Sequence, residues 1–439
     1  MSRGSTFSGM LRRFTLSFLV LVAATASIAE VPRARPEEVG LSSGKLARID
    51  TLFAEKVRKG ELAGIVVLVA RHGRVAHLSA FGDADAQQGR KLKADSLFRI
   101  YSMTKPMTAA ALMTLYEEGR FQLTQPLSDY IPEFKGLKVL RAADAKFDDV
   151  VAPKRAPTIL DSLRHTAGFT HGIAGDAFDE QYLKAGYFGL DVTLAGMMTR
   201  LAKLPLRYEP GTRWEYSVGP DIDARIVEVL SGQPFDEFLQ QRIFKPLGMR
   251  DTAFSLGRDQ AGRLATVYWM KDGKLTPLDA KHGSPDAIAA ITRPDLVNSY
   301  TAEHPRKGGS YGLVSSAEDY WRFAQMILNG GELDGARVLG PRTVSYMLSD
   351  HLTGSGISMD GGMSFGLGFG VVRDPAAFGR IGSKGTAFWG GAAATGFWID
   401  PVEDLVVVTM TQHFDVPATG AIEEQVASIV YGAIEEKGR

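Results

Sequence analysis

The 439-residue chain contains no cysteine, which excludes disulfide bonds, thiolate metal sites and a cysteine nucleophile. Its 50 basic and 50 acidic residues cancel, so no charge imbalance of the kind that binds nucleic acid is present. Only eight histidines occur, and they form no H-E-x-x-H sequence. We therefore expect no nucleic-acid partner, no metal and no other cofactor.

A hydrophobic run long enough to span a membrane, about 18 residues, is also missing from the chain after residue 29. Within residues 1–29, three arginines precede a short apolar core at 14–26, and small residues follow at 27–29. This order is typical of a secretory signal peptide. We expect a secreted or periplasmic protein with no stable membrane association after cleavage; an uncleaved anchor is the alternative.

Hydrophobic periodicity places strands near both ends of the remaining chain. The segments are a helix over 37–59, strands over 65–70 and 75–81, strands over 392–399 and 405–411, and an amphipathic helix over 422–433. The middle is mainly helical, with patterns at 222–230 and 235–243 and a small hairpin at 268–275. We predict an α/β (α+β) fold: residues 30–139 and 306–439 form a discontinuous sheet domain, and 140–305 form an inserted helical domain.

Ser102-Met103-Thr104-Lys105 is the most informative stretch, because it opens a buried helical pattern that ends near Gly119. A serine and a lysine three residues apart on a helix share one face, so the amine can reach the hydroxyl. Such a pair can make a serine nucleophilic without histidine. An S-x-x-K spacing arises by chance about once in a chain of this length, so the surroundings must decide.

Two other serines compete with Ser102, each within a G-x-S-x-G segment. Ser42, which also has Lys45 three residues on, follows a proline-containing stretch that cannot be a central strand. We interpret Ser42 or Ser43 as the N-cap of the first helix. Ser310 lies in Gly308–Gly312, whose glycines we expect to allow close backbone packing beneath a site.

A serine–lysine hydrolase also needs a group that relays a proton to the leaving group. Tyr216 is a candidate, since a neighbouring ammonium group favours the phenolate form; a core tyrosine is the alternative. His165 is interpreted as a buried structural histidine that joins a helix end to a loop.

The ordered motifs resemble the penicillin-recognising serine hydrolases over residues 37–435. They are Ser102-x-x-Lys105, Ser128-Asp129-Tyr130, Leu163-Arg164-His165-Thr166-Ala167-Gly168, Pro210-Gly211, Tyr216-Ser217, Pro246-Leu247-Gly248 and Gly312-Leu313-Val314-Ser315. This group includes class C β-lactamases, D-Ala-D-Ala carboxypeptidases and family VIII carboxylesterases. The resemblance implies a β-lactamase/penicillin-binding-protein-like fold, with an antiparallel sheet flanked by helices, and Ser102, Lys105 and Tyr216 as catalytic residues.

The departures from this pattern concern substrate choice. Lactamases and peptidases of the group carry Tyr-x-Asn, but here the third position is Val218, which cannot hydrogen-bond an amide. They also carry Lys-Thr-Gly on the strand beside the serine, where this chain has Trp389. The nearby segment 383–386 contains a lysine, but we interpret it as a turn ahead of that strand. Replacing a cation by tryptophan removes affinity for a carboxylate and adds an apolar wall.

A Trp-Gly-Gly sequence at this place resembles the family VIII carboxylesterases. We therefore predict a serine carboxylesterase that cleaves short-chain acyl esters through an acyl-enzyme on Ser102. By resemblance, the backbone N–H groups of Ser102 and Ala392 form the oxyanion hole. The expected substrate contacts are Trp389, Gly390, Gly391 and Val218. A β-lactamase or D-amino-acid peptidase is the first alternative, and a non-catalytic cell-wall-binding protein is the second.

Overall fold

The computed structural model describes residues 30–172, 175–187, 189–279, 281–282, 299–359, 361–414 and 416–435, together with residues 1 and 4. The expected signal peptide, 1–29, thus lies outside the described residues apart from those two. Contacts separate residues 1–30 from a compact unit, Val31–Arg439. Among the described residues, no helix has the length and apolarity needed to cross a bilayer.

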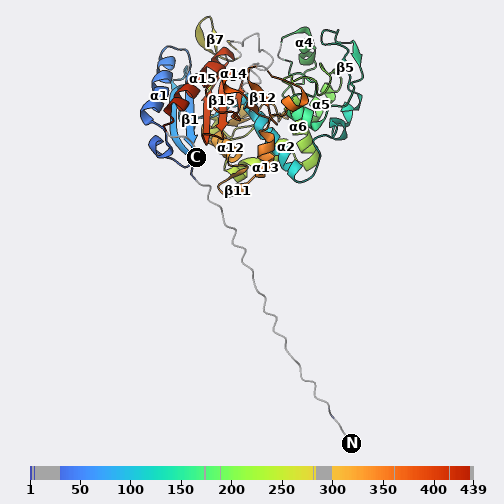
Figure 1. Cartoon of the computed structure of the whole chain (residues 1–439), viewed down its shortest axis with the longest axis horizontal. Coiled ribbons are helices and arrows are strands. Elements are labelled where there is room, and N and C mark those ends of the chain that lie inside the picture. Colours follow the sequence, from blue (N-terminus) through green and yellow to red (C-terminus); the bar gives the residue numbers. More distant parts are fainter. Residues whose placement is uncertain are drawn as a thin grey trace. The chain divides into compact units, whose positions relative to one another are not determined.

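The centre of the compact unit is an antiparallel sheet that joins strands from both ends of the chain. Its eight strands, in spatial order, are β12 (Met363–Phe365), β13 (Gly370–Val372), β14 (Ala387–Gly391), β15 (Thr395–Asp400), β16 (Leu405–Thr411), β1 (Gly64–Arg71), β2 (Arg74–Asp85) and β3 (Arg90–Lys91). Strand β1 lies between β2 and β16, with Ile65 opposite both Phe81 and Thr411. Figure 1 shows this meeting of blue and red segments. The predicted antiparallel sheet flanked by helices is confirmed.

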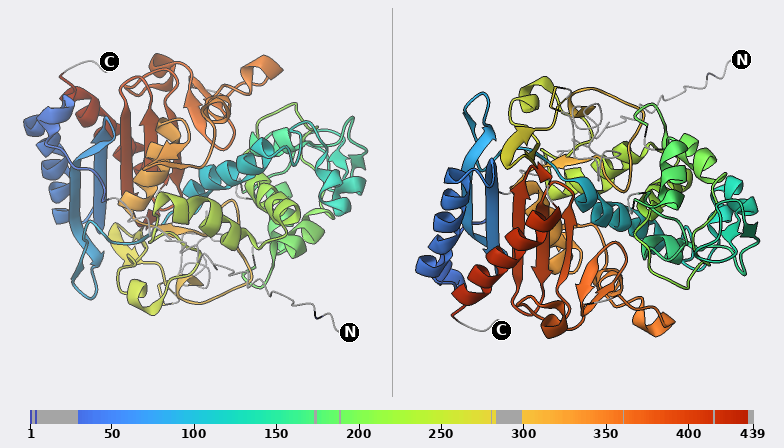
Figure 2. Two further views of the ribbon diagram at one scale, coloured as in Figure 1. Left: turned by 90° about the horizontal axis from the view of Figure 1, so that it is seen from below. Right: turned by 90° about the horizontal axis from the view of Figure 1, so that it is seen from above.

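Helices cover both faces of the sheet, which explains the unbroken apolar run in β1. Alternate β1 residues starting with Ile65 join one core, and those starting with Val66 join the other. The helices packed on the first face are α1 (Ser43–Arg58) and α15 (Val416–Ala433), and those on the second are α2 (Thr104–Glu117) and α12 (Ala317–Leu328). Figure 2 shows α1 and α15 running along the sheet.

Residues 140–305 contain short helices and two small hairpins. The helices are α3 (Ile159–Leu163), α4 (Ala177–Lys184), α5 (Leu194–Leu201), α6 (Gly219–Ser231), α7 (Phe235–Leu239), α8 (Lys245–Leu247) and α9 (Arg258–Ala261). The hairpins pair β5 (Val139–Leu140) with β6 (Val150–Val151), and β7 (Tyr268–Lys271) with β8 (Lys274–Pro277). All of 31–439 forms one compact unit, so the division at 139/140 and 305/306 stays a prediction.

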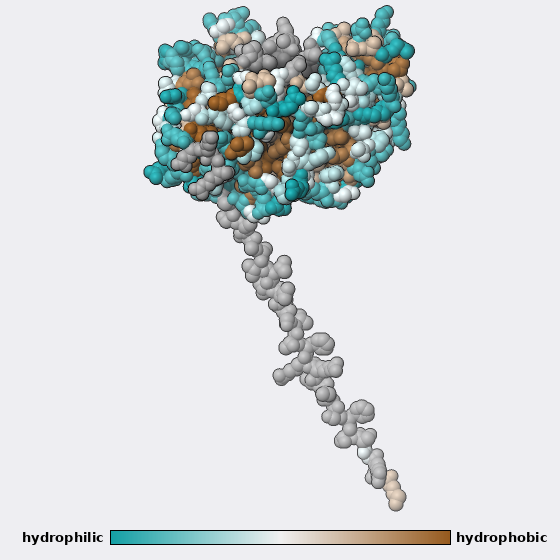
Figure 3. Space-filling model, in the orientation of Figure 1, coloured by the Kyte–Doolittle hydropathy of each residue, from teal (hydrophilic) through white to brown (hydrophobic). Residues whose placement is uncertain are grey.

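The described chain also contains other short strands and helices. They are β4 (Phe98–Arg99), β9 (Val314–Ser315), β10 (Glu332–Leu333), β11 (Ala336–Arg337), β17 (His413–Phe414), α13 (Pro341–Met347) and α14 (Pro375–Phe378). On the face drawn in Figure 3, hydrophilic side chains dominate the margins and hydrophobic ones gather between them. Large exposed apolar side chains, such as Ile381 and Val402, are otherwise scattered, which is ordinary for a protein surface.

Two predicted boundaries are wrong for identifiable reasons. The helix expected over 37–59 starts only at Ser43, because Gly40 takes a left-handed conformation (φ 68°) after a short 3₁₀ turn, Pro36–Val39. The strand expected over 392–399 begins only at Thr395, because residues 392–394 form the tight turn between β14 and β15. The hairpin expected over 65–81 is confirmed, as are the strand over 405–411 and the helices after Ser102 and Val218. The hairpin expected over 268–275 is confirmed and extends to Pro277.

Candidate active site

Ser102 lies in a strained turn at the start of α2. It is the middle residue of a 3₁₀ turn, Tyr101–Met103, that leads directly into the helix. The buried Tyr101 has a φ of 43°, which is unfavourable for a residue with a side chain. The pairing of β4 with β9 holds the chain just before this turn. The turn leaves Ser102 partly exposed, whereas the α2 residues that follow are buried.

Two side chains converge on the Ser102 hydroxyl. The Lys105 ammonium donates to Ser102 Oγ at 3.0 Å, and the Tyr216 hydroxyl donates to the same oxygen at 2.7 Å. Lys105 is 1% exposed, and its Nζ lies 4.6 Å from the centre of the Tyr216 ring. The structure therefore brings together the three residues that the sequence singled out, in an arrangement suited to moving a proton between them.

The two competing serines have other partners. Ser42 occupies the N-cap position of α1, where its N–H donates to the Ala433 carbonyl. Its hydroxyl makes no capping bond; the Glu37 carboxylate accepts from the Ser43 N–H instead. Ser310 is fully buried, and its hydroxyl donates to the Asp221 carboxylate.

The glycines beside Ser310 do allow close packing beneath the site. A Cβ on Gly309 would lie 2.0 Å from the Pro220 carbonyl oxygen, so only glycine is tolerated there. The Ser310 carbonyl in turn accepts from Lys105 Nζ at 2.8 Å. This segment thus forms the floor under the Lys105 ammonium, as the sequence predicted.

Two buried histidines flank Tyr216, of which the sequence identified one. His165 accepts from the Ser217 N–H at 3.2 Å and lies 2.9 Å from its hydroxyl, so it joins the end of α3 to the Tyr216 segment. The His171 ring stacks on Tyr216 with centroids 5.3 Å apart and planes 5° apart. Burial, together with the Lys105 charge, lowers the pKa of both imidazoles well below the usual value. Both are therefore neutral near pH 7.

Strand β14 approaches the serine turn through its glycines. A Cβ on Gly391 would lie 2.5 Å from the carbonyl oxygen of Ile100, two residues before Ser102. Gly390 and Trp389 precede it in β14, and Ala392 is the first residue of the following turn. All of these except Gly391 keep some exposed surface. The end of β14 thus lies against the backbone that presents Ser102.

The remaining predicted residues have different surroundings. Val218 is fully buried in the main core and precedes α6, so a direct substrate contact there stays a prediction. Residues 383–386 form a turn, closed by the Thr386 N–H donating to the Ser383 carbonyl at 3.2 Å, as predicted. Lys384 is exposed in that turn and lies ahead of β14.

An aromatic wall beside Ser102 was only partly foreseen. Trp389 lies 5.7 Å from the Tyr216 ring and 5.2 Å from Phe365, measured between ring centres. Trp214 stacks on Tyr216 at 6.3 Å and also contacts Phe365. Trp214 precedes Tyr216 by two residues. In an extended segment this spacing places both side chains on the same face, so the sequence could have predicted that Trp214 lies beside Tyr216. Phe365, on β12, carried no such signal.

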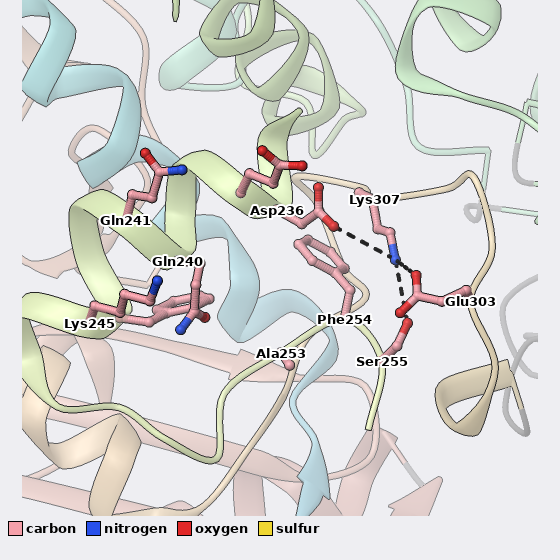
Figure 4. Close-up of a pocket in the computed structure, with 11 residues that line it drawn as sticks. Asp236, Gln240, Gln241, Lys245, Ala253, Phe254, Ser255, Glu303 and Lys307 are labelled. Atoms are coloured by element: carbon pink, nitrogen blue, oxygen red, sulfur yellow. Dashed lines mark hydrogen bonds and ion pairs between the residues drawn. The ribbon is translucent and has the colours of Figure 1, made fainter. Parts of the chain in front are cut away.

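A cavity of about 340 Å³, drawn in Figure 4, is lined by none of these residues. It is bordered by Asp236, Glu237, Gln240, Gln241, Phe244, Lys245, Ala253, Phe254, Ser255, Glu303 and Lys307. Lys307 points into it and donates to Glu303 at 2.8 Å. Within the described residues, no group of three histidine, aspartate or glutamate side chains is arranged to hold a metal ion.

Comparisons with known proteins show that the chain is similar to hydrolases. The family model described as beta-lactamase matches residues 49–430. An uncharacterised protein of Mycobacterium tuberculosis is 35% identical over 367 residues, which cover 81% of this chain and 86% of the relative. Esterase EstB of Burkholderia gladioli is 32% identical over 390 residues, which cover 86% of this chain and 93% of EstB. The structure of EstCE1, a hydrolase with promiscuous acyltransferase activity, is similar with a TM-score of 0.76, at 26% identity over 89% of this chain and 99% of EstCE1.

Proposed function

The chain belongs to the beta-lactamase family, and we propose that it is a serine carboxylesterase of the family VIII type. The observation that carries the proposal is the convergence of Lys105 and Tyr216 on the Ser102 hydroxyl. The similarity to EstB over most of both chains supports esters as the substrates.

Acylation begins with attack of Ser102 Oγ on the ester carbonyl carbon. Loss of a proton from the Lys105–Tyr216 pair leaves one of the two able to take the Ser102 proton as the new C–O bond forms. Tyr216 then protonates the alkoxide, which departs as the alcohol and leaves an acyl-enzyme. Water attacks this ester, and the same two groups now take the proton of the water and return one to Ser102 Oγ.

The oxyanion of each tetrahedral intermediate is assigned to the backbone N–H groups of Ser102 and Ala392. The close approach of Gly391 to Ile100 supports this assignment, because it brings the residue after β14 beside the serine turn. The position of Ser102 before the first turn of α2 also favours negative charge there.

The wall around Ser102 supports a neutral ester as the substrate, and a short acyl chain is part of the proposal. Trp389 occupies the position at which related lactamases and peptidases hold the substrate carboxylate with a cation. An indole offers apolar contact area and no charge, so it favours an uncharged acyl or alcohol group.

The test compares Ser102→Ala, Lys105→Ala and Tyr216→Phe with Ser42→Ala on p-nitrophenyl butyrate. Each of the first three variants should lose at least about 1,000-fold in kcat, because nucleophile and proton relay act as one unit. Ser42→Ala should match the wild type. Full activity of Ser102→Ala, or loss confined to Ser42→Ala, would refute the assignment.

The second candidate is a β-lactamase or D-amino-acid peptidase, which the family match favours because an ester and a lactam form the same kind of acyl-enzyme. We expect only weak hydrolysis of nitrocefin; a nitrocefin rate far above the best ester rate would reverse the order of the two proposals. Secretion or a periplasmic location remains a proposal that rests on residues 1–29.

A further inference from the structure

The Lys105 ammonium depends on one backbone carbonyl for its position. Its described hydrogen-bond acceptors are Ser102 Oγ at 3.0 Å and the carbonyl of Ser310 at 2.8 Å. The second residue after Tyr216, where related enzymes carry an amide side chain, is the buried Val218, whose side chain offers no acceptor. The Ser310 carbonyl is thus the fixed anchor that aims Lys105 at the nucleophile.

The peptide of Ser310 is itself held by one buried carboxylate. Asp221 Oδ1 accepts from the Gly309 N–H at 3.0 Å and from the Ser310 N–H at 3.4 Å, while Oδ2 accepts from the Ser310 hydroxyl. Arg306, 3% exposed, lies 3.4 Å from the same carboxylate. Asp221 is fully buried, so these contacts act without competition from water.

Asp221 also stands in a fixed relation to the other proton-transfer residue. It is the third residue of α6, which begins at Gly219, only three residues after Tyr216. A Cβ on Gly219 would lie 2.5 Å from the Ser162 carbonyl, so the start of α6 is packed tightly against α3. The start of α6 therefore fixes the position of Tyr216, which precedes it closely in the chain. It also fixes the position of Lys105, because Asp221 holds Ser310 and the Ser310 carbonyl accepts from Lys105.

Resting on the proposed function, we infer that Asp221 is a positioning residue that sets the proton-transfer geometry of Lys105 through the Ser310 peptide. It touches neither substrate nor reacting atoms. Its carboxylate acts one step back from the ammonium: it holds the N–H groups of Gly309 and Ser310 and the Ser310 hydroxyl, and thereby the residue whose carbonyl accepts from Lys105. A displaced Ser310 carbonyl would draw Lys105 Nζ away from Ser102 Oγ without altering the surfaces that bind the ester.

The experiment compares Asp221→Asn with Asp223→Asn as a matched control on the same helix. Asp223 is also buried, and burial together with the Asp221 charge raises its pKa well above the usual value, which favours the neutral form that an amide resembles. We expect Asp221→Asn to lower kcat on p-nitrophenyl butyrate at least about tenfold with KM within about twofold, since the lost interaction acts only on the chemical step. Asp223→Asn should keep both constants near the wild-type values.

Ser310→Ala provides a second variant that removes only the hydroxyl contact to Asp221 and keeps both N–H bonds. A smaller fall in kcat, about threefold, with unchanged KM is expected, and labelling of Ser102 by a fluorophosphonate should slow in parallel. Wild-type labelling on Ser102 tests the proposed function separately. If Asp221→Asn does not fold, kcat and the labelling rate of Ser310→Ala test the inference by themselves. Equal kcat in the Asp221 and Asp223 variants, or wild-type kcat and labelling in Ser310→Ala, would overturn the inference.

Discussion

Trp389 contributes much of the apolar surface of the aromatic wall beside Ser102. Its indole meets Tyr216 and Phe365, and part of it stays exposed. Trp389→Ala removes this apolar surface, so we expect kcat/KM for p-nitrophenyl butyrate to fall about tenfold, mainly through a higher KM. Steady-state kinetics on esters of graded acyl length measure the effect, which should grow with the chain.

Trp389→Phe is the matching control, because a smaller ring keeps most of the contact with Phe365. It should recover most of the loss seen with alanine. A fall in kcat at constant KM in Trp389→Ala would show instead that the indole positions Tyr216 and does not bind the acyl group.

The site residues that could be predicted were those marked by helical spacing or by a family motif. Ser102 and Lys105 share a helix face by spacing alone, and Tyr216 stood out by its neighbours and the family resemblance. Asp221 and His171 reach the same site through tertiary contacts with Ser310 and Tyr216, respectively. No periodicity records such contacts, since they depend on how separate loops pack.

At the level of elements, the approach of β14 to the serine turn gives a sharp prediction. In Gly391→Ala the new methyl group would meet the Ile100 carbonyl at 2.5 Å and Thr395 Oγ1 at 2.2 Å. The end of β14 must then retreat, which displaces the Ala392 N–H from the serine. If the Ala392 N–H is the proposed oxyanion donor, kcat should fall about 100-fold, the scale of one lost donor, while circular dichroism remains that of the wild type.

Gly44→Ala is the comparison, because a Cβ there meets nothing within 4 Å and the residue lies in α1. It should retain full activity and gain slightly in stability from the better helix former. Equal activity of the two glycine variants would contradict the assignment of the Ala392 N–H to the oxyanion hole.

Element types were predicted more reliably than element ends. The alternating cores explain why β1 reads as a continuous apolar run, and Gly119 marks the end of α2 as expected. The start of β15 was predicted three residues too early, because the turn before it contains Ala394 with a φ of 59°. Alanine gives no warning of a left-handed turn, so residues 392–394 looked like the beginning of the strand.

For the molecule as a whole, a buried carboxyl at the start of α12 makes stability depend on pH. Burial raises the pKa of Asp319 to about 7, while it accepts from the Asp251 N–H at 2.7 Å and from the Thr252 hydroxyl at 2.9 Å. The folded state therefore keeps a proton that the unfolded state has lost between about pH 4 and pH 7. The free energy of unfolding falls as the pH rises through that window.

Asp319→Asn carries no titrating group and should lack this fall. Relative to the variant, the wild type should lose up to about 4 kcal/mol between pH 4 and pH 8, measured by urea unfolding. Asp144→Asn, at an exposed loop position, should follow the wild type. A difference between wild type and Asp319→Asn that stays constant over this range would contradict the raised pKa.

The place of β1 between β2 and β16 governs when activity can arise. Ile65 pairs with Thr411, so the sheet closes only after nearly the whole chain has been synthesised. Strand β14 is held to β1 through β15 and β16, and Trp389 and Ala392 come with it. Contacts this distant in sequence form late in folding. A nascent chain thus carries Ser102 and Lys105 for most of its synthesis without a finished catalytic centre, which delays hydrolysis until the last strands have docked.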